Sequence, residues 1–299
     1  MNEAAAHRIV VGIDGSGTAR GAVRWAAREA ARRGVPLRIV YADVAALPVL
    51  PEIPGVPWSH AHRTAIRAEV ENRLTEAADA ATEESPRLHP QTEAVPGTPG
   101  SVLIEESRSA ALLVVGDRGF GGFTGLLAGS VAVAVTAHGH ADTVVVRTGH
   151  DRPPGGEPGP VVVGIDGSPH TANLLDHAFR RAAEVGVPLH VVHTWHLAGI
   201  STRWMRVGPP TEEIQQGAER LLAEQLAGWG ERFPDVAVHR FPVEGSPSAT
   251  LLEHAAGAEL VVVGARGRGG FTGMLLGSTS QALIHHSPCP VLVVRTPGR

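Results

Sequence analysis

The heptapeptide VVGIDGS occupies residues 10–16 and recurs letter for letter at residues 162–168. Each copy lies in a continuous apolar run rich in β-branched residues, Ile9–Ile13 in the first case and Val161–Ile165 in the second. Runs without polar alternation are typical of strands that are buried on both faces, as in parallel sheets. Because Asp-Gly-Ser follows directly, the heptapeptide predicts a buried strand that ends in a turn and leads into a helix.

The repetition extends along most of the chain. GVPL at residues 34–37 recurs at 186–189, and Pro and Gly are concentrated in the segment GHDRPPGGEPG at 149–159. Such a composition is typical of a linker. We therefore predict two homologous domains, at residues 7–148 and 160–297, and a length of 299 residues is also suited to two domains.

Strands and helices are expected to alternate within each domain. Further strands are expected at Leu37–Ala42, Leu112–Val115, Thr143–Arg147, Leu189–Thr194, Leu260–Val263 and Val291–Arg295. The main helices are expected at Thr18–Arg33, Thr64–Thr82, Thr171–Glu184 and Glu212–Arg232, with Ser16 and Ser168 capping the first and third. This alternation predicts the α/β fold class, with two tandem doubly wound, Rossmann-like parallel sheets and right-handed crossovers.

The composition excludes several classes of protein. Lysine is absent, so all 26 basic residues are Arg, which excludes a G-x-x-x-x-G-K phosphate loop and Schiff-base chemistry. The net charge is −4 without a concentrated basic face, which argues against nucleic-acid binding. The single Cys289 excludes a disulfide framework, and no apolar run approaches the roughly 18 residues of a membrane span. We expect a cytoplasmic protein.

A glycine-rich segment follows one strand of each domain, VVGDRGFGGFTGLLAGSV at 114–131 and VVGARGRGGFTGMLLGST at 262–279. Both have the pattern G-x2-G-x9-G-S, filled by Gly116, Gly119, Gly129 and Ser130 or by Gly264, Gly267, Gly277 and Ser278. Glycines let backbone amides approach a polyphosphate, and the N-terminus of the next helix favours an anion. Arg118 and Arg266 can add positive charge. The alternative is a mobile loop whose serine only caps its helix.

Asp14 and Asp166 end the heptapeptide strands. In open α/β sheets a ligand lies beyond the carboxyl ends of the strands, where the strand order reverses. A carboxylate repels phosphate, so these side chains are expected near ribose hydroxyls, an adenine amino group or a bridging Mg²⁺. The alternative is a carboxylate that only stabilises the turn or caps the helix.

These two patterns together resemble the universal stress protein family, and the duplication resembles its tandem members. The resemblance implies five-stranded sheets of order 3-2-1-4-5 and ATP in both repeats. Mg²⁺ is expected with the nucleotide, near Asp14 and Asp166. It implies contacts to adenine and ribose from Gly12, Asp14 and Ala42, and from Gly164, Asp166 and Thr194. It implies contacts to the phosphates from Gly116, Gly119, Gly129, Ser130 and Val131, and from Gly264, Gly267, Gly277, Ser278 and Thr279. The candidate sites also include Asp117 and Arg118, and Ala265, Arg266 and Arg268.

The two glycine-rich segments differ in charge. Asp117 stands where the second copy has Ala265, and Phe120 stands where it has Arg268. A change of about two charges beside an anion corresponds to roughly 1–2 kcal/mol when it is partly screened. We therefore expect the second repeat to bind nucleotide more tightly than the first.

The candidate general bases form no recognisable catalytic set. They are His138, His140, His254, His285 and His286. The simpler interpretation is that these histidines lie at the C-terminal ends of helices, where they interact favourably with the helix dipole. We therefore predict an ATP-binding stress-response regulatory protein rather than an enzyme. Two alternatives stay open, a slow Mg-dependent ATPase or phosphotransferase and a nucleotide-independent interaction scaffold.

The last strands, Thr143–Arg147 and Val291–Arg295, are rich in valine, and exposed apolar strand edges attract partners. The resemblance implies that these strands pair the two repeats as an intramolecular pseudo-dimer. We also expect two chains to form a homodimer and a protein partner to bind, whose identity the sequence does not give. The segments Leu47–Trp58 and Leu197–Pro210, the latter with Trp204, are interpreted either as lids over the nucleotide or as plain surface loops.

Overall fold

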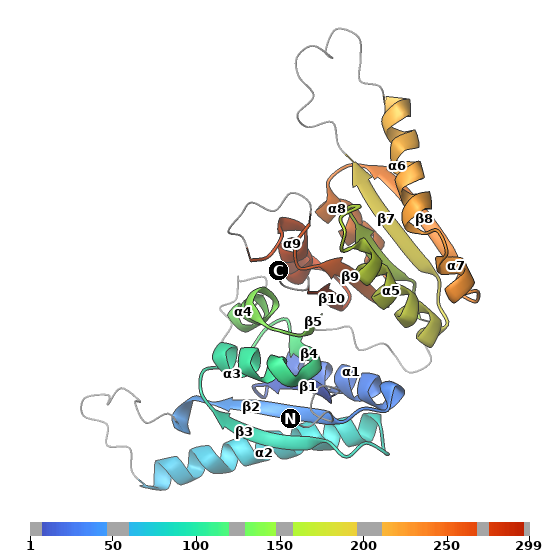
Figure 1. Cartoon of the computed structure of the whole chain (residues 1–299). Helices are drawn as coiled ribbons and strands as arrows, with labels where there is room; N and C mark the ends of the chain where they lie inside the picture. Colours follow the sequence, from blue (N-terminus) through green and yellow to red (C-terminus); the bar gives the residue numbers. More distant parts are fainter. Residues whose placement is uncertain are drawn as a thin grey trace, which may run out of the picture. The chain divides into compact units, whose positions relative to one another are not determined.

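The chain folds into two units of the same architecture (Figure 1). Their bounds are Met1–Asp151 and Arg152–Arg299. The computed structural model describes residues 8–46, 60–119, 129–147, 158–195, 211–267 and 275–295. The two units are described one after the other.

Unit 1 contains a parallel sheet with the order β3-β2-β1-β4-β5. Its strands are β1 (Arg8–Ile13), β2 (Leu37–Asp43), β3 (Gln91–Pro96), β4 (Ala110–Gly116) and β5 (Asp142–Val146). Its main helices are α1 (Gly17–Arg33), α2 (His60–Glu84), α3 (Pro99–Glu106) and α4 (Ser130–His138). The predicted order 3-2-1-4-5 is confirmed.

Unit 2 repeats this order as β8-β7-β6-β9-β10, again with parallel neighbours. Its strands are β6 (Val161–Ile165), β7 (Leu189–Trp195), β8 (Val238–Glu244), β9 (Leu260–Gly264) and β10 (Val291–Val294). Its helices are α5 (Thr171–Val185), α6 (Thr211–Gln225), α7 (Trp229–Arg232), α8 (Pro247–His254) and α9 (Ser278–His286).

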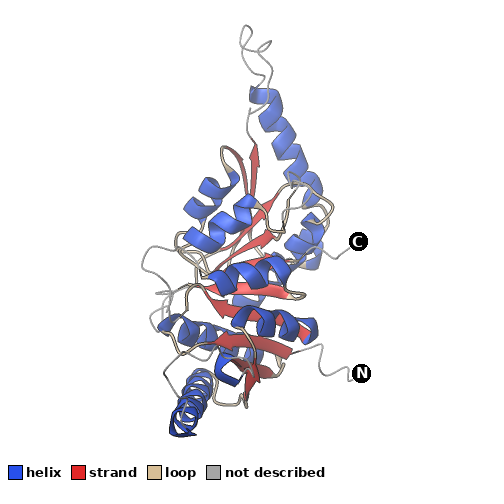
Figure 2. Cartoon of the chain, turned by 90° about the vertical axis from the view of Figure 1, so that its left-hand side faces the viewer, coloured by secondary structure: helices blue, strands red, loops and turns tan. Residues whose placement is uncertain are grey.

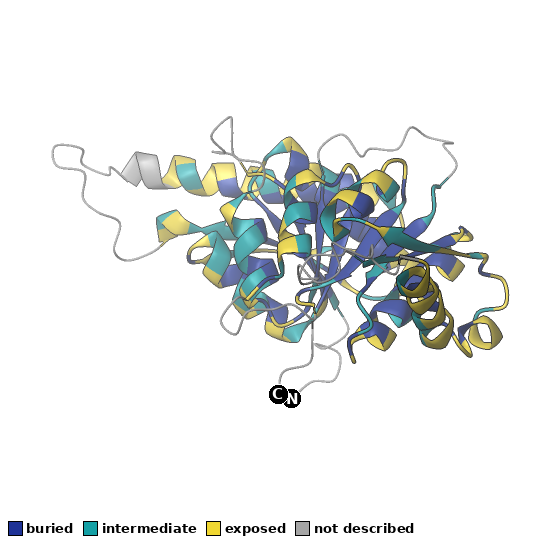
Figure 3. Cartoon of the chain, turned by 90° about the horizontal axis from the view of Figure 1, so that it is seen from above, coloured by how far each residue is buried: buried dark blue, intermediate teal, exposed yellow. Residues whose placement is uncertain are grey.

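Helices cover both faces of each sheet (Figure 2). In unit 1, α1 and α2 pack together on one face and α3 and α4 on the other. In unit 2, α8 and α9 pack together, while α5 contacts β6, β7 and β9 and α6 contacts β7 and β8. The central strands are buried, while the outward helix faces are exposed (Figure 3). Burial on both faces explains the continuous apolar runs of the strand sequences.

The two first helices begin differently. The Ser16 side chain caps α1 by accepting a hydrogen bond from the Ala19 amide at 3.2 Å, as predicted. The corresponding prediction for Ser168 is wrong, because His170 is the N-cap residue of α5. The Ser168 carbonyl instead accepts a bond from the Thr171 amide at 3.1 Å, so an additional turn precedes the helix.

A second prediction was wrong at the expected helix Glu212–Arg232. The chain forms α6 and the short α7 there, and Gly228 between them has φ 78. A left-handed residue interrupts a right-handed helix, and glycine adopts that conformation without steric cost. The lid segments 47–58 and 197–210 lie outside the described residues, as does most of the linker 149–159. The pseudo-dimer pairing stays a prediction.

Candidate functional site

The strand order reverses between β1 and β4 in unit 1, and between β6 and β9 in unit 2. β1 pairs with β2 on one side and with β4 on the other, and the next crossovers leave in opposite directions. Asp14 follows β1 and Gly116 ends β4, so both candidate segments begin at neighbouring carboxyl ends. Asp166 and Gly264 have the same placement in unit 2. This is the position that open α/β sheets use for ligands.

The Asp14 carboxylate lies between the turn that follows β1 and the glycine-rich segment that follows β4. Its Oδ1 accepts a hydrogen bond from the Ser16 amide at 2.9 Å, which stabilises the turn in which Gly15 has φ 87. Its Oδ2 lies only 2.5 Å from the position that a Cβ on Gly119 would take. One carboxylate oxygen therefore serves the turn, as the simpler interpretation proposed, and the other lies against the glycine-rich segment.

Unit 2 has the same arrangement. Asp166 Oδ1 accepts a bond from the Ser168 amide at 2.9 Å, and Oδ2 lies 2.9 Å from the position of a Cβ on Gly267. Real Cβ contacts under 3.0 Å essentially do not occur, so both positions require glycine unless the carboxylate moves. The second glycine of the pattern therefore has a defined steric role in both repeats.

The glycine-rich loops are closed at their bases by matching backbone bonds. The Gly129 amide donates to the Asp117 carbonyl at 2.6 Å, and the Gly277 amide donates to the Ala265 carbonyl at 2.7 Å. Each base is also joined to the last strand, because Asp117 and Ala265 donate their amides to the carbonyls of Val146 and Val294 at 2.8 Å. The last glycine of each pattern is thereby held beside the first two.

The serines of the pattern are the first residues of α4 and α9, not their caps. Gly129 and Gly277 are the N-cap residues, with extended backbones and no side-chain cap. Ser130 and Ser278 are exposed. The first amides of a helix have no intrahelical partner and attract anions. The interpretation in which the serine only caps its helix is wrong for both repeats.

The charges at the loop bases differ between the repeats. Asp117 is fully buried, with Oδ2 at 3.3 Å from Arg147 Nη1 and 3.6 Å from Arg118 Nε. Its carboxylate therefore pairs with the two arginines nearest the loop. In unit 2, Ala265 is buried at this position and Arg266 is exposed. The base of the second loop thus has an alanine in place of the buried aspartate of the first.

The remaining predicted residues are placed less close to the loops. Ala42 and Thr194 lie near the carboxyl ends of β2 and β7. The space beside the Gly12 Cα is filled by Leu103 of α3, since a Cβ there would lie 2.5 Å from the leucine Cδ1. Gly164 has the same relation to Leu251 of α8, at 2.7 Å. These two glycines therefore let a helix pack closely on the first strand.

Other predicted residues can be placed only in part. Val131 and Thr279 are half-buried in the first turns of α4 and α9. Arg268 and Phe120 lie outside the described residues, so their contrast is not tested. His138, His254, His285 and His286 lie in the last turns of their helices, as the helix-end interpretation expected.

The sequence analysis did not identify Arg73 of α2. Its Nη1 donates to the Asp14 carbonyl at 2.7 Å, and its guanidinium lies 6.0 Å from the Tyr41 ring centroid. Unit 2 has Leu221 against the equivalent turn, and the His193 Nδ1 lies 2.9 Å from the Ile165 carbonyl oxygen. An arginine on a long polar helix gave no signal that it reaches the turn.

Two negative findings apply to the described part of the chain. There, no three or more His, Cys, Asp or Glu side chains are grouped so that they could hold a metal ion. No helix within the described ranges has the length and apolar character needed to cross a bilayer.

Comparison with known proteins identifies the family. Residues 5–147 and 159–295 each match the universal stress protein family. A universal stress protein of Mycolicibacterium smegmatis is 38% identical over 301 residues, covering 99% of both chains. One from Mycobacterium tuberculosis is 37% identical over 294 residues, covering 96% of both. The crystal structure of one from Archaeoglobus fulgidus shares the fold, with a TM-score of 0.66 and 23% identity, covering 98% of this chain and 99% of that one. The chain belongs to the universal stress protein family and carries two tandem copies of its domain.

Proposed function

We propose that each repeat binds ATP, and that the bound nucleotide regulates the association of this protein with a partner. One observation carries the proposal. In both repeats an aspartate carboxylate lies against a loop glycine at the point where the strand order reverses, and an uncapped helix N-terminus follows the same loop. An acidic group and an anion-attracting group are thus combined in one site.

The two ends of a nucleotide require these opposite properties. Phosphates are suited to the free amides and exposed hydroxyls at Ser130 and Ser278, because a helix N-terminus and a glycine-rich backbone both attract anions. A carboxylate such as Asp14 or Asp166 repels phosphate but accepts hydrogen bonds from ribose hydroxyls. The order along the site is therefore phosphate at the helix and ribose at the aspartate.

Glycine also provides the room for the ligand. A side chain on Gly119 or Gly267 would occupy the space next to the carboxylate, where a ribose has to approach. Asp14 or Asp166 would be the carboxylate to hold a Mg²⁺ ion bound with the triphosphate, and such an ion would neutralise phosphate charge. The remaining residues position the nucleotide through backbone atoms, which suits binding better than chemistry.

The proposal is tested by the nucleotide content of freshly purified protein. Nucleotides are released by denaturation, identified by chromatography and counted per chain for the wild type, Asp14→Asn, Asp166→Asn and the control Asp79→Asn, whose carboxylate is exposed on α2. We expect bound adenine nucleotide that decreases in the two site variants and not in the control. If the wild type carries none and takes up none from Mg-ATP, the proposal fails and the scaffold alternative stands. If ADP dominates, turnover has to be measured.

A further inference from the structure

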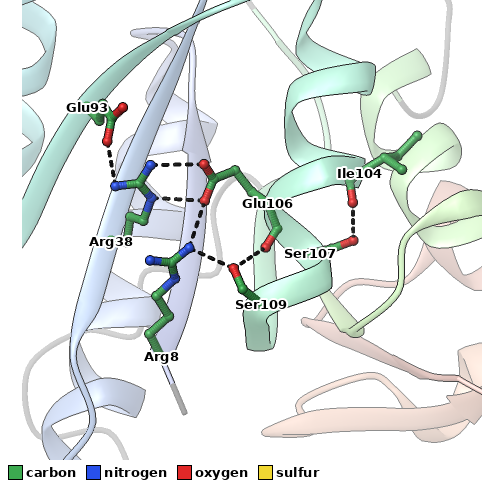
Figure 4. Close-up of polar contacts among 7 residues, drawn as sticks. All are labelled: Arg8, Arg38, Glu93, Ile104, Glu106, Ser107 and Ser109. Carbon is green, nitrogen blue, oxygen red and sulfur yellow. Dashed lines mark hydrogen bonds and ion pairs between the residues drawn. The ribbon is translucent and has the colours of Figure 1, made fainter. Parts of the chain in front are cut away.

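The two repeats anchor one helix to the sheet by different chemistry, at the strand ends opposite the candidate site. In unit 1 the anchored helix is α3, whose last residue is Glu106 (Figure 4). The Glu106 carboxylate accepts bonds from Arg38 Nε and Nη2, both at 2.9 Å, and from Arg8 Nη2 at 3.3 Å. Arg38 Nη1 also lies 2.7 Å from Glu93 of β3. This arginine–glutamate network ties α3 to three strands.

Every member of this network on β2, β3 and α3 is replaced in unit 2. The register of the strands gives the equivalences: Arg38 pairs with Gln91 in unit 1, and His190 pairs with His239 in unit 2. In the aligned repeats His190 stands for Arg38, His239 for Gln91, Phe241 for Glu93 and His254 for Glu106. Three members of the ion-pair network and the neighbouring Gln91 thus correspond to three histidines and a phenylalanine in unit 2.

These four side chains form one cluster, which we call the histidine cluster. The His190 ring centroid lies 5.4 Å from His239, 4.9 Å from Phe241 and 6.0 Å from His254. The rings of Phe241 and His254 are 4.5 Å apart. The described contact between α8 and the sheet at this end is therefore made by aromatic rings, where unit 1 has ion pairs.

The surroundings of His190 oppose its protonation. Burial lowers its pKa, and the charges of His239 and His254 lower that pKa further. The His190 Nδ1 is buried and has no hydrogen-bond partner in the described part of the chain. An imidazolium carries N–H donors at both ring nitrogens, so protonation would bury a donor without an acceptor.

Among the described residues, the acidic side chains of the elements packed against β7 lie on the other face of the sheet or at an exposed position. On β8, Arg240 and Glu244 alternate with His239 and therefore point to the other face of the sheet. On α8, Glu253 is exposed, and β6 presents no titratable residue. α5 and α6 cover the other face, and α9 contacts α8 and β10.

We propose that the histidine cluster is a pH-sensitive anchor, so that mild acid loosens α8 and the edge strand β8 in unit 2 and leaves α3 and β3 in unit 1 in place. Because the folded His190 has a lower pKa than the unfolded residue, its contribution to stability is complete above the unfolded pKa of roughly 6.5. It is lost as the pH falls from there through the folded pKa.

This anchor is connected to the candidate site. Leu251 and His254 lie on the same helix, and Leu251 fills the space beside Gly164 on the first strand of unit 2. Loosening of α8 therefore also loosens the support of the second site. A preferential loss of nucleotide from unit 2 in acid is the consequence, and it rests on the proposed function.

The test is amide hydrogen exchange of the full chain without nucleotide, read by mass spectrometry. Exchange is compared at about pH 7.5 and about pH 5.5, on either side of the ordinary histidine pKa, with intrinsic rates corrected for pH. We expect a several-fold loss of protection in β8 and α8 at the lower pH, since each pKa unit of depression contributes up to about tenfold. Protection of β3 and α3 should change less than about twofold, because a change of that size corresponds to a pKa difference of only a fraction of one unit.

Two variants complete the test. His190→Phe keeps an aromatic ring without a titratable group and should abolish the response, while His89→Gln, at an exposed histidine of unit 1, should leave it unchanged. An equal response of the two repeats, or a response that persists in His190→Phe, overturns the proposal. The comparison between the repeats of the wild type is decisive by itself if His190→Phe does not fold. Because nucleotide is absent, the result does not depend on the proposed function.

Discussion

Replacing Gly119 by alanine tests the geometry of the first site. The added Cβ would lie 2.5 Å from Asp14 Oδ2, and its next contact is the carboxyl carbon of the same residue at 3.7 Å. The φ of Gly119 is outside the left-handed region, so the backbone accepts alanine. The steric conflict therefore falls on the Asp14 side chain alone, which has to turn away.

The magnitude follows from what Asp14 loses. Turning away breaks the bond from the Ser16 amide, at 2.9 Å, which contributes about 1 kcal/mol. Holding the side chain off its preferred rotamer costs about 1 kcal/mol more. These two costs lower the stability of unit 1. Binding loses the hydrogen bond between the Asp14 carboxylate and the ribose, and a bond to a charged group contributes about 2 kcal/mol, which corresponds to roughly thirtyfold in Kd.

The assay is calorimetric titration with Mg-ATP, which gives the number of sites and both affinities. Gly119→Ala should weaken one site and leave the other unchanged, and Gly267→Ala should do so in the second repeat, with a smaller effect because its contact is 2.9 Å. The control is Gly217→Ala on α6, where a Cβ meets nothing within 4 Å. If Gly119→Ala folds and both of its sites bind Mg-ATP with wild-type affinity, the assignment of Asp14 to the nucleotide is refuted.

Three further predictions concern charge and burial. Asp117 pairs with Arg147 and Arg118, so the positive charge of these arginines is partly neutralised, and the first site should bind ATP about tenfold more weakly than the second. In the same titration, Asp117→Asn should reduce this difference in affinity, because the arginines regain about 1–2 kcal/mol of screened attraction for the phosphates. Glu106→Gln should lower the free energy of unfolding of unit 1 by about 1–3 kcal/mol, since a charge-assisted pair is lost, and this is measured by urea unfolding followed with exchange in α3. Burial raises the pKa of the Cys289 thiol to about 11, so this cysteine should react with iodoacetamide at about pH 8 only in unfolded protein; rapid labelling of the folded chain would contradict its burial.

The alternation of strands and helices could be predicted because it depends on the local pattern of apolar residues along the sequence. The runs Ile9–Ile13 and Val161–Ile165 lie within β1 and β6. A single sequence also showed the duplication, which made the glycine pattern visible twice. The break at Gly228 was missed because an isolated glycine is tolerated in many helices, and only the observed φ of 78 distinguishes a break from a weak position.

The side-chain contacts of the site could be predicted only in part. The neighbourhood of Asp14 and Gly119 follows from strand order, because consecutive carboxyl ends meet at one edge of a parallel sheet. The pairing of Asp117 with Arg147 could not be predicted from strand order, because each of these charged residues could equally have been exposed to solvent. The bond between Arg73 and the Asp14 carbonyl depends on how α2 packs, and local pattern contains no information on that.

The duplication separates what the site requires from what may differ around it. Both repeats keep the aspartate bond to the turn, the glycine beneath the carboxylate and the closure between the loop ends, with nearly equal distances. They differ at the helix anchor, where Arg38 and Glu106 of unit 1 correspond to His190 and His254 of unit 2. They also differ at the loop base, where Asp117 corresponds to Ala265. None of these differences alters the glycines of the loop pattern. Each one changes either the charge beside the loop or the contacts that hold the neighbouring helix on the sheet. We therefore expect a functional difference between the two repeats to depend on the helix anchor and the loop-base charge, and variants that exchange these residues between repeats should transfer the behaviour with them.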